Sequence, residues 1–84
     1  LVMVFVLEGY VFINSEPKMI WEIAEAALKI EGIKMAHAVT GQFDIVAYAE
    51  FANIDMLRRI ITELQALNGV QRTQTAVAIP PRLK

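Results

Sequence analysis

The sequence lacks cysteine altogether, which excludes both a disulfide framework and a thiolate site. Only 20% of the 84 residues are charged, and eight basic against nine acidic residues give a net charge of −1. The basic residues do not gather into the cluster on which non-specific DNA binding depends, so we expect no direct nucleic-acid partner. The apolar run over residues 1–7 is much shorter than the about 20 residues that cross a bilayer. We therefore expect no membrane association and a cytoplasmic, soluble protein.

Apolar residues, in contrast, are abundant. They make up 56% of the chain, and the mean hydropathy is +0.45. A chain of this length forms one small domain, here residues 1–84, and buries only about 60% of its unfolded surface. Because one small core cannot hide so much apolar surface, the composition predicts self-association.

The centre of the chain has the pattern of a β-hairpin. Strand-like runs cover residues 33–38 and 45–51, and the short segment between them contains Gly41. Two such runs separated by a few residues that include glycine are typical of antiparallel strands joined by a turn. We therefore expect a hairpin whose turn covers residues 39–44.

Helical periodicity lies on each side of this hairpin. The spacing of apolar residues predicts helices near residues 17–31 and 53–68. Polar residues Asn14 and Ser15 are cap candidates for the first helix, and Asn53 is the cap candidate for the second.

Strand-like runs occupy both ends of the chain. The first includes residues 10–13, with a bend or bulge expected at Gly9, and residues 1–7 either extend it or form an extra strand. The last run, residues 70–79, is polar in its first half and apolar in its second. This asymmetry predicts that one end lies near solvent or a ligand cleft and that the other is buried.

The order strand, helix, hairpin, helix, strand predicts an α+β fold of the ferredoxin-like βαββαβ type. Two helices cover only one face of its four-stranded antiparallel sheet. The other face remains apolar, because neither hairpin strand alternates cleanly; Ile33, Met35 and Val39 are expected on one face of theirs. Sheet-to-sheet pairing into a dimeric α/β barrel-like assembly would cover it.

Several short motifs, taken in order, resemble the RAM domain of the Lrp/AsnC (feast/famine) family of transcriptional regulators. The resemblance extends over nearly all of the chain from Glu8 onward. The matching motifs are Glu16-Pro17, Glu31-Gly32-Ile33, Val39-Thr40-Gly41, Phe43-Asp44, and the spaced set Leu67, Gly69, Val70, Thr73 and Thr75.

The resemblance implies dimers with facing sheets that assemble into rings, commonly octamers. It also implies that a small effector, usually a free amino acid, binds in clefts between dimers near the central turn. The sequence contains no helix-turn-helix, so we expect a stand-alone domain that assembles with itself or with full-length Lrp/AsnC regulators. Direct operator binding is not carried over.

The chemistry of the turn agrees with an effector site. Gly41 permits close approach of backbone amides to a carboxylate, and Asp44 can counter an ammonium group. Alternatively, Gly41 serves only the hairpin and Asp44 satisfies turn amides. The predicted ligand-binding residues are Thr40, Gly41, Gln42, Phe43, Asp44, Thr73 and Thr75.

Two other functions remain open. His37, the single histidine, would serve a cofactor-free enzyme of the monooxygenase-like dimeric barrel type, with Trp21 and Tyr48 expected nearby. The sequence has no second histidine, no cysteine and no nucleophile triad, so we expect no catalytic residue, metal or cofactor. An ACT-like amino-acid-binding module has the same topology. The residue pattern of the turn, Val-Thr-Gly-x-Phe-Asp, favours the RAM domain over the ACT module. The sequence indicates neither the effector nor the ring size.

Overall fold

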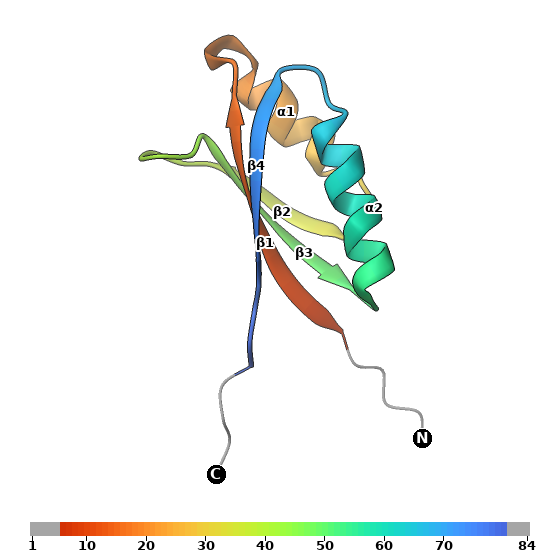
Figure 1. The fold of residues 1–84 in the computed structure, drawn as a ribbon. Helices are drawn as coiled ribbons and strands as arrows, with labels where there is room; N and C mark the ends of the chain where they lie inside the picture. The colour runs from red at the N-terminus through yellow and green to blue at the C-terminus, as the bar shows by residue number, and fades with distance from the viewer. Residues whose placement is uncertain (1–5, 81–84) are drawn as a thin grey trace, which may run out of the picture.

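A computed structural model of the chain describes residues 6–80. Its elements follow the predicted βαββαβ order (Figure 1). They are β1 (Leu7–Ser15), the short 3-10 helix η1 (Pro17–Met19), α1 (Ile20–Ala27), β2 (Ile33–Ala38), β3 (Ile45–Phe51), α2 (Ile54–Gln65) and β4 (Val70–Val77). No helix within residues 6–80 is long and apolar enough to cross a membrane.

The four strands form one antiparallel sheet in the order β2-β3-β1-β4. Both α-helices lie on the same side of this sheet, as Figure 1 shows. α1 packs on β2 and β3, whereas α2 packs on β4 and β3. The fold class and the placement of both helices on one face are therefore as the sequence predicts. We refer to the side without helices as the open face.

The core lies between the sheet and the two helices. Every second residue of β3 is buried, from Ile45 to Phe51, and these residues face buried side chains of α2 such as Ile60 and Leu64. Val11 contributes the same face of β1. Full burial of one such aliphatic side chain is worth about 1.5–3 kcal/mol, so this layer is the main source of stability.

The bulge in the first strand is not where the sequence predicted it. Pairing runs regularly through Gly9 to both neighbouring strands, and the register shift falls between Asn14 and Ser15. A Cβ atom at Gly9 would lie 3.2 Å from the Phe51 ring, so this glycine makes room for a packed side chain. Of the run 1–7, residues 1–5 lie outside the described part, and β1 begins at Leu7.

A second register shift, between Ile33 and Met35, separates two residues that were expected on one face. Ile33 is buried under the helices, whereas Met35 is 38% exposed and lies opposite Tyr48. The extra residue turns the strand over at this point. The prediction that these two side chains share a face was therefore wrong.

The first helix is shorter than predicted. Proline and a 3-10 turn open it, with Met19 N–H donating to the Glu16 carbonyl at 2.9 Å, and α1 ends at Ala27. Neither Asn14 nor Ser15 caps it, because no side-chain cap bond is present. The second helix begins as expected, since the Asn53 side chain accepts from Met56 N–H at 2.9 Å.

The apolar half of β4 is not buried. Val77 is 44% exposed and Ala76 is also exposed, because β4 is an edge strand that α2 covers only near its start. The predicted burial of this end was therefore wrong for a single chain.

Candidate functional site

The β2–β3 turn forms the tip of a hairpin that extends away from both helices (Figure 1). Val39 N–H donates to the Asp44 carbonyl at 2.9 Å and closes the turn. Gly41 has φ 109°, a backbone conformation that favours glycine. Thr40, Gly41 and Gln42 are all exposed. The predicted hairpin and its turn are confirmed.

The base of the turn is bonded to the end of β1. Asp44 N–H donates to the Ile13 carbonyl at 2.9 Å, and Asp44 Oδ2 accepts from Ser15 N–H at 2.8 Å. The Asn14 side-chain amide donates to the Gln42 carbonyl at 2.8 Å. Asn14 and Ser15 therefore hold the turn. Sequence reasoning missed this role, because a polar pair after a strand is equally typical of a helix cap.

An aromatic contact supports the same turn. Phe43 is half-buried, and its ring centroid lies 5.2 Å from that of Phe12 at an interplanar angle of 40°. Such tilted pairs are among the favourable aromatic geometries. The turn thus has an exposed tip and a firmly held base.

Thr73 and Thr75 lie elsewhere. They face Ile13 and Val11 across the β1–β4 ladder, on the helix side of the sheet. Thr73 Oγ1 accepts from the Gln65 side-chain amide at 3.0 Å and so joins β4 to α2. Because β1 lies between β3 and β4, the two threonines and the turn are apart from one another within one chain.

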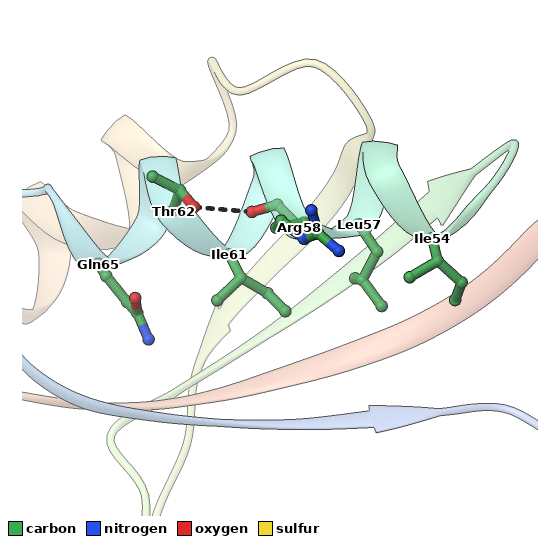
Figure 2. A pocket seen from close by; sticks show the side chains of 6 residues that line it. All are labelled: Ile54, Leu57, Arg58, Ile61, Thr62 and Gln65. Carbon is green, nitrogen blue, oxygen red and sulfur yellow. Dashed lines mark hydrogen bonds between the residues drawn. The ribbon is translucent and has the colours of Figure 1, made fainter.

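Two cavities of the described chain are lined by other residues. One, of about 220 Å³, lies between α1 and the segment that follows α2. The other has a volume of about 400 Å³ and runs along α2 (Figure 2). We call the latter the α2 groove; its lining residues are Ile54, Leu57, Arg58, Ile61, Thr62 and Gln65.

The histidine considered for catalysis is exposed on the open face, opposite Val46. Trp21 is 71% exposed on α1, in the helical layer on the other side of the sheet. The expected proximity of His37 and Trp21 was therefore wrong. Within residues 6–80, no group of three histidine or acidic side chains is placed to hold a metal ion.

The open face carries a polar cluster that sequence reasoning missed. Glu8 lies directly opposite Glu50 in the β1–β3 register, and the Tyr48 hydroxyl contacts both carboxylates, Glu50 at 3.1 Å. The hydrogen bond to Glu8, partial desolvation and the charge of Glu50 raise the pKa of the Tyr48 hydroxyl. Alternation along β3 was the available signal that Tyr48 and Glu50 share a face, whereas only the β1–β3 register places Glu8 beside them.

Comparison with known proteins agrees with this architecture. The Lrp/AsnC ligand-binding domain family matches residues 8–81. An HTH-type transcriptional regulator of Pyrococcus horikoshii is 29% identical over 73 residues, which are 87% of this chain and 49% of the relative. The chain thus spans about half the length of that curated relative.

Solved structures share the fold. A protein of Thermus thermophilus has a TM-score of 0.86 at 24% identity, covering 93% of this chain and 99% of that one. A transcriptional regulator of Neisseria meningitidis, solved as a complex with L-Met, has a TM-score of 0.76 at 21% identity, covering 88% and 50%. These structures show the shared fold, and the family match over residues 8–81 shows that the chain belongs to the Lrp/AsnC ligand-binding domain family.

Proposed function

We propose that this chain is a regulatory module that binds a free amino acid, or a similarly small zwitterion, in a cleft between dimers. The cleft is lined by residues of the central turn and of β4, and occupancy controls assembly. The proposed lining residues are Thr40, Gly41, Gln42, Phe43, Asp44, Thr73 and Thr75.

The open turn is the observation that carries this proposal. A Cβ atom at Gly41 would have no neighbour within 4 Å, so a ligand can approach the backbone. In the described part of the chain, Gly41 and Gln42 donate no backbone hydrogen bond to another backbone group. Such free N–H groups suit a carboxylate. Asp44 lies beside them with only Oδ2 engaged among the described hydrogen bonds, which leaves Oδ1 for an ammonium group.

A second chain is needed to complete such a site, because β1 separates the threonines from the turn. The open face supports dimer formation. It presents Tyr10 at 40% and Met35 at 38% exposure beside the half-buried Phe12 and Val46. Facing sheets would cover these side chains, and dimers would then meet at their edges. The complex of the Neisseria meningitidis regulator with L-Met supports an amino acid as the effector class.

Assembly with itself or with full-length Lrp/AsnC regulators would make the module regulatory. The P. horikoshii relative is an HTH-type regulator twice as long as the matched segment, so such a regulator offers a second domain for hetero-assembly. The octameric ring remains part of the proposal. The enzyme alternative gains no supporting observation, since exposed His37 has no described hydrogen-bond partner.

Calorimetric titration of the wild type and of Asp44→Asn against all twenty amino acids tests the proposal. The asparagine oxygen can still accept from Ser15 N–H, so the turn keeps its anchor and loses only the charge. A hydrogen bond to a charged group is worth about 1.5–3 kcal/mol, so affinity should fall about ten- to a hundredfold.

Asp55→Asn is the matched control, because Asp55 is an exposed carboxylate in the first turn of α2 and should leave binding unchanged. Heat absent for every amino acid would contradict the proposal. An affinity that is indifferent to Asp44→Asn would leave the turn as a structural hairpin.

A further inference from the structure

One stripe of α1 carries large apolar side chains in solvent. Trp21 is 71% exposed and Leu28, at the C-cap, is 48% exposed. They are seven residues apart and therefore lie on one line along the helix, about 10.5 Å apart. Exposed Glu25 lies between them on the same line. We call Trp21, Glu25 and Leu28 the α1 stripe. Tryptophan is among the residue types enriched at the energetic centres of protein contacts.

The α2 groove has the same spacing with the opposite charge. Ile54 and Ile61 are also seven residues apart, and Arg58 lies between them at the equivalent position. In Figure 2, Ile54, Leu57 and Ile61 point to the same side of α2. Ile54 is 57% exposed, and Ile61 is half-buried against the core. The side chain of Arg58 is 77% exposed, and its one salt bridge within residues 6–80 is a 3.9 Å contact to Asp55.

The two surfaces are therefore complementary. Both follow the order apolar, charged, apolar at positions i, i+4 and i+7, acidic at Glu25 on the stripe and basic at Arg58 in the groove. When two helices are laid along each other, the charges meet at the centre and the apolar residues meet on both sides. The match holds for parallel and for antiparallel helices, because each charge lies near the middle of its set.

We propose that the α1 stripe of one copy docks in the α2 groove of a second copy. The contact is heterologous, since different surfaces of the two copies meet. Repetition of such a contact closes a ring or extends a filament. This inference deepens the assembly part of the proposed function: it uses neither the open face, which forms the proposed dimer, nor the turn, which binds the effector.

A single contact of this kind should be weak. Two packed helices bury less than the about 1,200–2,000 Å² of a standard stable interface. A sheet-paired dimer, however, presents two stripes and two grooves, so contacts reinforce one another through effective concentration. Association beyond the dimer should therefore depend steeply on protein concentration.

Charge reversal tests the pairing by sedimentation velocity over a concentration series. Glu25→Arg and Arg58→Glu should each raise the concentration for half-assembly beyond the dimer at least about tenfold, because each sets like charges face to face. The double variant Glu25→Arg/Arg58→Glu should restore wild-type assembly. Arg59→Glu is the matched control, because Arg59 is exposed next to Arg58 in sequence but does not line the groove.

Trp21 supplies a second readout, since it is the only tryptophan. Its emission should shift to the blue as the wild type assembles, and should not shift in Arg58→Glu, whose own Trp21 is untouched. Circular dichroism checks that each variant is folded.

A wild type that stops at the dimer would overturn this inference, and so would single reversals that assemble normally or a double variant that is not rescued. Single reversals that assemble normally, or a double variant that is not rescued, leave the sheet-paired dimer and the cleft between dimers intact, so these failures are distinct from failure of the proposed function. A wild type that stops at the dimer would overturn both, because the proposed amino-acid cleft lies between dimers. Arg59→Glu matching the effect of Arg58→Glu would also overturn this inference.

Discussion

Tyr48 has its hydroxyl between two carboxylates that the sheet register places on neighbouring strands. Glu8 accepts its hydrogen bond, and Glu50 lies 3.1 Å away. Because deprotonation would set a third negative charge beside these two, the pKa of the Tyr48 hydroxyl is raised, mainly by the Glu8 hydrogen bond. Because the Tyr48 hydroxyl stays protonated, it remains a hydrogen-bond donor placed between the carboxylates of Glu8 and Glu50 on the open face.

We expect Glu8→Gln to lower the pKa of Tyr48 toward the ordinary tyrosine value of about 10. Removing that carboxylate removes the largest contribution to the shift. An absorbance titration of tyrosinate measures the change, with Tyr48→Phe identifying the signal that belongs to this residue. A titration curve unchanged by Glu8→Gln would contradict the contact.

The same shift predicts the sign of a stability effect. The pKa of Tyr48 is higher in the folded chain than in the unfolded one. The contribution of Tyr48 to stability is therefore fully present below about pH 10 and is lost as the pH rises through the pKa of the folded chain. Above pH 10, the melting temperature of the wild type should therefore fall more steeply with pH than that of Tyr48→Phe.

At the scale of elements, a comparison of two glycines distinguishes the effect of backbone strain from the effect of packing. Gly32, between α1 and β2, has φ 101°, and a Cβ atom there would lie 2.7 Å from Ile60 Cδ1. Gly41, in the β2–β3 turn, has φ 109° and no neighbour within 4 Å of that position. Both glycines permit a positive φ, but only Gly32 is also enclosed by the core.

Gly41→Ala should lower the free energy of unfolding by about 1–3 kcal/mol, through backbone strain alone. Gly32→Ala should cost about 1–3 kcal/mol more, because its methyl group also overpacks the core beside Ile60. Urea denaturation of both variants measures the difference. Equal losses would show that the contact of Gly32 with α2 relaxes freely.

At the scale of the whole molecule, the open face is the largest feature that a single chain leaves unexplained. Tyr10 and Tyr48 pair on it at 5.5 Å between ring centroids, and Val46 lies between Phe12 and His37 in the register. The centre of this face is apolar beside the polar cluster of Glu8, Tyr48 and Glu50, and an apolar sheet surface without a covering layer is unusual for a monomer. The proposed dimer would cover it.

Light scattering should accordingly show a dimer or larger species at micromolar concentration. Val46→Glu should raise the dimer dissociation constant at least about a hundredfold, because pairing would bury an unpartnered carboxylate. Ala52→Glu, an exposed change just before α2, is the control. A folded wild-type monomer at this concentration would refute the dimer.

Local sequence patterns determined the order of the elements, the central turn and the Asn53 cap, and the element order indicated a fold with both helices on one side of the sheet. These features depend on residues a few positions apart, which repeat at the period of a helix or a strand. The family resemblance rests on the same local motifs, and the match over residues 8–81 confirms it.

Only the tertiary structure decided where the strands shift register, because a bulge depends on how two strands pair in the sheet. It likewise assigned Asn14 and Ser15 to the turn rather than to a helix, through bonds to Gln42 and Asp44 about 28 residues away in sequence. It separated Thr73 and Thr75 from the turn, since β1 inserts between β3 and β4. The sheet order is non-local, and no short-range pattern in the sequence encodes it.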